Sequence, residues 1–513
     1  MSRTKRFLGG VSLGYTFQVL LTVVGLWLTP FLLHRIGQHD YGLWLVGAQL
    51  LAYLTLMDFG IVALLPRATA YATGRAGSVS DAKDLPAIIG QTIWLVLCQT
   101  PLVALAACVL WFMLPVAWGP LRTPIGVVML AFVLAFPLRI FAAVLQGLQD
   151  LAFLGKLNIA SWLCGTAITI ALVFAGKGLY ALALGWVVIQ LLTAGGCYFR
   201  LRRSFPGVLP RRLPSLSWLT ARGQLKQGFW VSVSQLAQVF VNGTDMLIIG
   251  TLLGPLAVVP FSCTGKLIGV LANQPQMLMQ AAGPALSEMK MAEPRQKLFQ
   301  VCTALSQAML LVSGAVVCIV LTVNKGFVNW WVGAGQYGGL LLSALLLLTM
   351  LLRHWNTTAV YAIFCFGYER RISVTTLLDG LVTVGGTILF VRLFGVVGAP
   401  MGALLGVCVV SLPGNLSALA RENGVRPIAL IKTLWPWFYR FVLLAAGALL
   451  VARVSAPQTF PTIGLTALLS GGTYCLVMLP LIFREPLGTY VRPRLSAARL
   501  KFRQVLLVPG ADV

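Results

Sequence analysis

Long apolar segments recur along almost the whole chain, and the short loops between them alternate between basic and nearly uncharged. Of the 513 residues, 58% are hydrophobic and only 10% are charged, whereas a soluble domain has roughly 25% charged residues. A helix that crosses a bilayer needs about 20 apolar residues, and about fourteen such segments can be placed. These features exclude an aqueous globular fold and predict an all-α integral membrane protein.

The predicted spans form two sets of six and a final pair. The first set comprises 8–34, 41–65, 86–114, 124–147, 157–175 and 179–199. The second set comprises 228–252, 256–282, 298–323, 338–367, 373–394 and 396–419, followed by the pair 437–454 and 462–483. The domains predicted from these spans are a six-helix bundle (1–199), a basic cytoplasmic linker (200–226), a second six-helix bundle (227–420), an additional helix pair (421–483) and a basic cytoplasmic tail (484–513).

Basic residues concentrate on one side of this topology. If the N-terminus is cytoplasmic, most of the 38 Lys and Arg residues lie in cytoplasmic loops, in the linker and in the tail. The basic residues left for the outer side are few: Arg35, Arg122, Lys177, Lys325, Arg392 and Arg453. Because Lys and Arg accumulate in cytoplasmic loops of membrane proteins, we predict that both termini are cytoplasmic.

The net charge of +25 is spread over inner loops, where anionic headgroups lie. We therefore expect anionic membrane lipids as partners, and no nucleic acid. The basic tail predicts an amphipathic segment on the inner surface, with a disordered tail as the alternative. The ten cysteines are scattered and form no C-x-x-C pair, so we expect no metal site and no cofactor.

The two six-span sets show signs of duplication. A shift of about 220 residues aligns several landmarks of the two halves. The aligned pairs include Gly147 with Gly367, Gly165 with Gly385, Phe174 with Phe394, and Gly178 with Gly398. Because each set has an even number of spans, both bundles enter the membrane in the same direction and are related by a pseudo-twofold axis along its normal. This geometry predicts a cavity between the bundles, suited to alternating access.

A few ionisable residues are predicted to lie within the spans, where they are unfavourable unless they face water, a partner or a substrate. The cations are Arg139, Lys266 and Arg353, with His354 beside the last, and the acids are Asp58, Asp245 and Asp379. Guanidinium groups match phosphate oxygens, and ammonium groups also bind them. We therefore expect the cations and His354 to bind an anionic substrate.

Structural roles remain open for the same residues, because the cations can also form ion pairs or extend toward the headgroups. Asp245 and Lys266 are predicted at comparable depth on neighbouring helices, which favours a structural pair; uptake of H⁺ or Na⁺ by Asp245 is the alternative. Asp58 can brace a bend at Gly60 or take part in ion coupling. For Asp379, a structural role and ion coupling both remain open.

Short motifs in both halves carry a family resemblance. The first half contains Gly-Val-Ser-Leu-Gly-Tyr (10–15), Leu-Thr-Pro-Phe-Leu-Leu-His-Arg-Ile-Gly (28–37), Tyr-Gly-Leu-Trp (41–44) and Met-Asp-Phe-Gly-Ile (57–61). The second contains Thr-Asp-Met-Leu-Ile-Ile-Gly (244–250), Gly-Lys-Leu (265–267) and Gly-Pro-Ala-Leu-Ser-Glu-Met (283–289). Over about residues 5–420 the chain resembles polysaccharide flippases of the multidrug/oligosaccharidyl-lipid/polysaccharide (MOP) exporter superfamily. Pro260-Phe261 departs from the Gly-x-Tyr common there.

The resemblance implies a transporter that moves undecaprenyl-pyrophosphate-linked oligosaccharide repeat units across the bacterial inner membrane by alternating access, without ATP hydrolysis. Its product would serve the biosynthesis of a surface polysaccharide such as lipopolysaccharide or exopolysaccharide. H⁺ or Na⁺ coupling is compatible with it. A polysaccharide polymerase and chain-length proteins would be its partners.

Several alternatives stay open. A lipid II flippase would need similar chemistry, because its substrate also carries a pyrophosphate. A cation-coupled multidrug exporter of the same superfamily is disfavoured by the intramembrane cations, since its ligands are typically cationic. A membrane glycosyltransferase or polymerase is disfavoured because the outer loops are mostly short and nearly devoid of acids. No G-x-x-x-x-G-K-[ST] loop occurs in the sequence, and we predict that the protein is not an enzyme.

Overall fold

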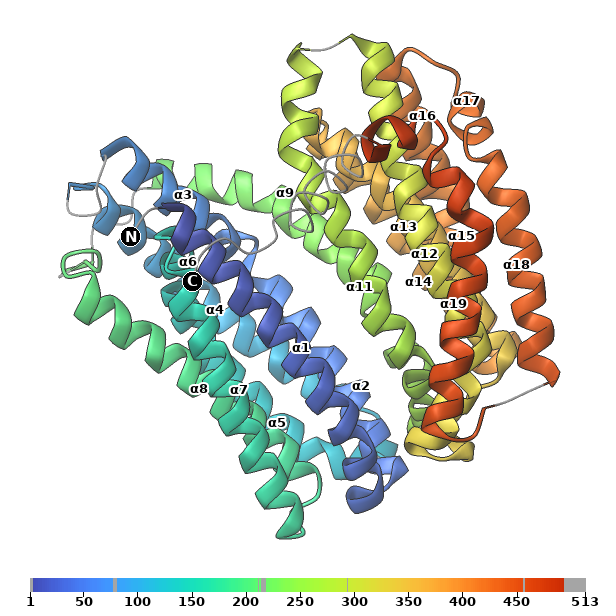
Figure 1. Cartoon of the computed structure of the whole chain (residues 1–513). Helices are drawn as coiled ribbons and strands as arrows, with labels where there is room; N and C mark the ends of the chain where they lie inside the picture. The colour runs from blue at the N-terminus through green and yellow to red at the C-terminus, as the bar shows by residue number, and fades with distance from the viewer. Residues whose placement is uncertain are drawn as a thin grey trace, which may run out of the picture. The chain divides into compact units, whose positions relative to one another are not determined.

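The computed structural model describes residues 3–76, 81–210, 212–213, 218–292, 294–454 and 457–492. Nearly all of these residues are helical, and none of them forms a strand (Figure 1). The predicted amphipathic segment of the tail lies outside the described residues. The chain divides into two compact units, Met1–Val259 and Pro260–Val513. The boundaries predicted for the two six-helix bundles, 1–199 and 227–420, remain predictions.

The first unit is built from long helices interrupted by short turns. They are α1 (Arg3–Ile36), α2 (Gln38–Thr55), α3 (Ile61–Ala76), α4 (Leu85–Phe112), α5 (Gly119–Ala135), α6 (Arg139–Gly147), α7 (Leu151–Phe174), α8 (Leu179–Ser204), α9 (Trp218–Asn242) and α10 (Asp245–Leu252). Single 3₁₀ turns follow α2 (Leu56–Asp58) and α5 (Phe136–Leu138). These turns place polar residues at breaks within membrane-spanning segments.

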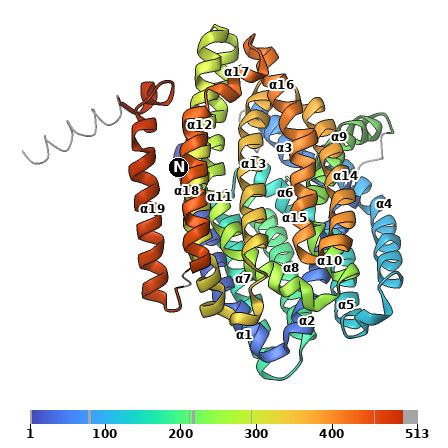
Figure 2. The ribbon, with the colours of Figure 1, turned by 90° about the vertical axis from the view of Figure 1, so that its right-hand side faces the viewer.

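The second unit contains most of α11 and the remaining helices. These are α11 (Pro255–Ala292), α12 (Arg295–Val332), α13 (Leu340–Cys365), α14 (Glu369–Phe394), α15 (Gly398–Gly406), α16 (Leu412–Asn423), α17 (Pro427–Lys432), α18 (Trp435–Val454) and α19 (Phe460–Ile482). A π-helical turn, Val407–Ser411, joins α15 to α16. Helices α18 and α19 both pack on α12 and lie side by side in Figure 2.

The helices agree with the predicted number of spans. Within the described ranges, 11 helical segments are long and apolar enough to cross a membrane, or 12 with the bent pair of α2 and α3. One of them, Glu369–Asn423, has 55 residues but consists of α14 and α15–α16, which pack against each other. A single helix of that length would extend about 80 Å, far beyond the hydrocarbon core of about 30 Å. With the bent pair included, this segment counted as two spans, and α9–α10 added at the predicted span 228–252, the number of spans agrees with the predicted fourteen.

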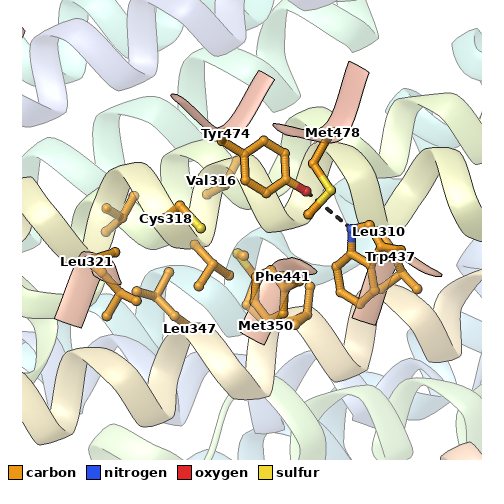
Figure 3. Close-up of a cluster of buried hydrophobic side chains, with 14 of the residues drawn as sticks. Leu310, Val316, Cys318, Leu321, Leu347, Met350, Trp437, Phe441, Tyr474 and Met478 are labelled. Carbon is orange, nitrogen blue, oxygen red and sulfur yellow. Dashed lines mark hydrogen bonds between the residues drawn. The ribbon is translucent and has the colours of Figure 1, made fainter. Parts of the chain in front are cut away.

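An aromatic cluster holds the last two helices onto α12 (Figure 3). Trp437 and Phe441 of α18 stack with ring centroids 4.7 Å apart. The indole of Trp437 donates a hydrogen bond to the hydroxyl of Tyr474 on α19 over 3.2 Å. That hydroxyl donates to the carbonyl oxygen of Leu311 on α12 over 2.8 Å. The additional helix pair is therefore an integral part of the second unit.

Glycine residues allow α14 and α15 to pack closely, as small residues do between membrane helices. A Cβ on Gly386 would lie 3.1 Å from the Cα of Gly402. A Cβ on Gly402 would overlap the backbone nitrogen and hydroxyl of Thr387. The contact therefore depends on the absence of side chains at these positions.

We expect Gly402→Ala to destabilise the purified protein by about 1–3 kcal/mol, because the added methyl group overpacks the contact with α14. The measurement is thermal unfolding in detergent. Gly385→Ala is the matched control, since a Cβ at this position on α14 meets no atom within 4 Å. Equal unfolding temperatures for the two variants would contradict the role of this close contact.

Candidate functional site

Asp58 lies at a sharp bend between α2 and α3. Phe59 and Gly60 follow it with φ angles of 46° and 70°, and the two helical segments are bent by 53°. The Asp58 carboxylate accepts a hydrogen bond of 2.7 Å from the backbone N–H of Gly60. This bond satisfies a donor near the start of α3 that has no intrahelical partner. Asp58 is 1% exposed, so the bend buries a carboxylate within the first unit.

Arg139, the first residue of α6, supplies the opposite charge. Its Nη2 lies 3.7 Å from Oδ2 of Asp58, which is long for a hydrogen bond, so the attraction is mainly electrostatic. The side chain is 34% exposed, and its Nη1 is buried without a hydrogen-bond partner in the described structure. Arg139 therefore neutralises Asp58 while keeping donors for another acceptor.

Arg353 of α13 forms a closer pair with Asp379 of α14. Nη1 lies 3.1 Å from Oδ2, and Nη2 lies 3.4 Å from Oδ1. Asp379 also accepts hydrogen bonds from Ser411, over 2.5 Å, and from Thr383, over 3.0 Å. The carboxylate is 1% exposed. Both of its oxygens are satisfied, as a buried charge requires.

The backbone around Asp379 makes room for this cluster. A Cβ on Gly406 would overlap both Oδ1 of Asp379 and the hydroxyl of Thr383. Directly after Gly406, the π-helical turn carries Ser411 to the carboxylate; such turns occur frequently at functional sites. The sequence interpretation did not include Thr383, Gly406 or Ser411. The regular spacing of Gly398, Gly402 and Gly406 was the available signal of a closely packed helix face.

His354 follows Arg353 but faces other helices. Its Nδ1 lies 2.7 Å from the hydroxyl of Ser313 on α12, and the ring also hydrogen-bonds the backbone of Ala272 on α11. His354 is 3% exposed. The structure thus directs the two neighbours to different contacts, and their joint action on one substrate remains a prediction.

Lys266 and Asp245 belong to different units. Lys266 lies half-buried on α11, and it takes no part in the ion pair described for its own unit, Arg353 with Asp379. Asp245 is the first residue of α10, where a negative charge is favoured by the helix dipole. The predicted pair between them remains a prediction.

Comparison with known proteins places the chain in a family. A family model described as "Polysaccharide biosynthesis protein" matches residues 54–333, more than half of the 513 residues. The chain belongs to this family of polysaccharide biosynthesis proteins. The match includes Asp58, Arg139, Asp245 and Lys266, whereas Arg353 and Asp379 lie beyond it. No curated protein sequence matches the chain.

Solved structures show which fold this member of the polysaccharide biosynthesis family has. An inward-facing multidrug resistance MATE family transporter of the MOP superfamily aligns with a TM-score of 0.56 at 16% identity, covering 80% of this chain and 99% of that chain. The lipid II flippase MurJ, in an inward closed conformation, aligns with a TM-score of 0.53 at 11% identity, covering 86% and 98%. A MATE structure in complex with MaD3S gives 0.52 at 17% identity, covering 83% and 95%. The fold is therefore that of MOP-superfamily transporters, which confirms the expected resemblance and a multi-pass membrane protein.

The charges of this polysaccharide biosynthesis protein follow one scheme in both units. Each unit contains a buried aspartate neutralised by an arginine: Asp58 by Arg139, and Asp379 by Arg353. The two arginines differ in how many of their hydrogen-bond donors already have a partner. Arg353 uses both terminal nitrogens on Asp379 and nearby oxygens, whereas Arg139 keeps an unpaired Nη1. Nη1 of Arg139 is buried, so an additional anion could bind it only after a rearrangement that exposes this atom.

Proposed function

We propose that this protein is a flippase that moves undecaprenyl-pyrophosphate-linked oligosaccharide repeat units across the bacterial inner membrane for surface polysaccharide biosynthesis. The observation that carries the proposal is the family match over residues 54–333. A fold shared with transporters, including a lipid II flippase, supports movement of a lipid-linked substrate. Alternating access between the two bundles is the proposed mechanism, and both termini are cytoplasmic in this scheme because the inner loops are basic.

The intramembrane cations are the proposed contacts for the pyrophosphate. Arg139 and Lys266 are the foremost candidates, because each has donors that no described partner in its own unit uses. Arg353 and His354 are already hydrogen-bonded, so we assign them to positioning the binding surface. Asp58, Asp245 and Asp379 remain candidates for H⁺ or Na⁺ coupling.

The decisive experiment is to delete the gene and measure the lipid-linked glycan pool on each leaflet together with the surface polysaccharide. We expect repeat units to accumulate on the inner leaflet and surface polysaccharide to be lost. Accumulation of lipid II would instead assign the protein to peptidoglycan precursors, a second candidate supported by the fold of MurJ. An unchanged pool with altered drug sensitivity would indicate a multidrug exporter. A polymerase and chain-length proteins are the proposed partners, and their copurification with the protein is a separate test.

We expect Lys266→Ala to lower export about 10- to 100-fold without preventing insertion, because a hydrogen bond to a charged group contributes about 1.5–3 kcal/mol. Lys266→Arg should retain part of the export. The measurement is surface polysaccharide at matched protein levels in the membrane. Lys325→Ala is the control, since it removes the same charge from an exposed position on α12. Wild-type export by Lys266→Ala would argue against a role of Lys266 in binding the pyrophosphate.

A further inference from the structure

A cavity of about 190 Å³ lies in the second unit, where α18 begins and α19 ends. Gln307 and Leu311 of α12 line it on one side, and Lys432 and Trp437 on another. Arg484 and Glu485, which follow α19, also line it. Since α18 and α19 are candidate membrane spans, a cavity at their ends lies at the boundary between the hydrocarbon core and the headgroups.

The apolar side of the cavity is held in place by the aromatic cluster of Figure 3. Trp437 lines the cavity while stacking on Phe441 and donating to Tyr474. Leu311, on the opposite helix, accepts the hydrogen bond of the same tyrosine through its carbonyl oxygen. The cavity is therefore formed by residues that fasten α18 and α19 to α12, so a ligand would meet a preorganised site.

The polar side of the cavity has donors and acceptors that are not used internally. Lys432 and Arg484 are exposed, and within the described residues neither side chain has a hydrogen-bond or ion-pair partner. Gln307 donates through Nε2 to the carbonyl oxygen of Thr433 over 3.3 Å, but its Oε1 is buried and has no donor in the described structure. Glu485 adds a carboxylate. A complementary ligand would present an anion to the two cations and an N–H or O–H group to Gln307 and Glu485.

We propose that this cavity binds the headgroup of a glycerophospholipid from the surrounding bilayer. The phosphodiester would contact Lys432 and Arg484, because charge-assisted hydrogen bonds to phosphate are strong. The ammonium or hydroxyl group of the headgroup would donate to Gln307 and Glu485. The acyl chains would follow the apolar surface of α18 and α19, where Leu443, Leu465, Leu468 and Leu476 are exposed. This site is separate from the intramembrane cations and does not depend on the identity of the transported glycan.

The test uses the purified, delipidated full-length protein and native mass spectrometry, with phosphatidylethanolamine, phosphatidylglycerol and phosphatidylcholine added in turn. We expect the first two lipids to bind at least five-fold more tightly than phosphatidylcholine, whose headgroup has no N–H or O–H donor. Combining Lys432→Gln with Arg484→Gln should weaken the binding of phosphatidylethanolamine at least ten-fold. Arg453→Gln is the control, because it removes an exposed cation from the other end of α18.

A second variant and two competitors make the test specific. Gln307→Leu should reduce the preference for phosphatidylethanolamine over phosphatidylcholine, because it removes the Oε1 acceptor; it also removes the hydrogen bond from Nε2 to Thr433. The proposal is wrong if the double variant binds phosphatidylethanolamine as the wild type does. It is also wrong if inorganic phosphate displaces the lipid at equal concentration, which would indicate an anion site without lipid selectivity. Displacement by farnesyl pyrophosphate at equal concentration would overturn it in favour of an isoprenoid pyrophosphate site.

Discussion

Arg353→Ala is expected to lower the stability of the purified protein by about 3–5 kcal/mol, because it leaves the buried carboxylate of Asp379 without its charge partner. Asp379 lies 1% exposed among α13, α14 and the π-helical turn, so the variant would keep a buried negative charge there. Removing both charges together, by Arg353→Ala with Asp379→Ala, should recover part of this loss. Thermal unfolding of the single and double variants in detergent measures the coupling between the two residues.

Arg392→Ala is the control for this pair, since it removes an exposed cation from α14. Arg353→Lys should retain part of both stability and export, because lysine keeps the charge but lacks the planar fork that contacts both carboxylate oxygens. If Arg353→Ala unfolds at the wild-type temperature and still loses export, Arg353 acts on the substrate directly. That result would contradict the positioning role that we assign to it.

Gly60→Ala is expected to destabilise the first unit by about 2–5 kcal/mol and to reduce the yield of folded protein. Gly60 has a φ of 70°, which costs a residue with a side chain about 1–2 kcal/mol. An added Cβ would also lie 2.6 Å from the carbonyl oxygen of Gly228 and 2.8 Å from the Cβ of Val231 on α9. Overpacking of this kind costs about another 1–3 kcal/mol.

The measurement is the folded fraction by size-exclusion chromatography, followed by thermal unfolding. Gly74→Ala in α3 is the matched control, because a Cβ there meets no atom within 4 Å and alanine favours the helix over glycine. Similar yields and unfolding temperatures for the two variants would show that the bend at Asp58 tolerates a side chain. Its close packing against α9 would then have no part in stability.

The aspartate–arginine pairs of the two units do not correspond through the predicted repeat. A shift of about 220 residues takes neither Asp58 to Asp379 nor Arg139 to Arg353. In the first unit the carboxylate braces a bend of 53°, whereas in the second it joins neighbouring helices through Arg353 and Ser411. If the halves arose by duplication, each has acquired its buried acid independently.

The sequence was sufficient to predict the membrane class, the helical fold and the approximate positions of the spans. Hydropathy is a local property, and a bilayer imposes a fixed minimum length on each apolar segment. The predicted spans 157–175 and 373–394 therefore coincide closely with α7 and α14. The same local reasoning selected Asp58, Arg139, Arg353 and Asp379, since an ionisable group within an apolar segment is rare and unfavourable without a partner.

Only the tertiary structure decided which partners these charges have. Arg353 and His354 are neighbours in sequence, yet one contacts Asp379 on α14 and the other Ser313 on α12. Whether two helices bring an arginine onto an aspartate depends on their rotation and packing distance, which hydropathy does not contain. Gly406 and Ser411 likewise show their roles only when α15 and the π-helical turn are placed against Asp379. The sequence by itself determined which segments cross the membrane and where charge is unfavourable, and helix packing decided how each charge is neutralised.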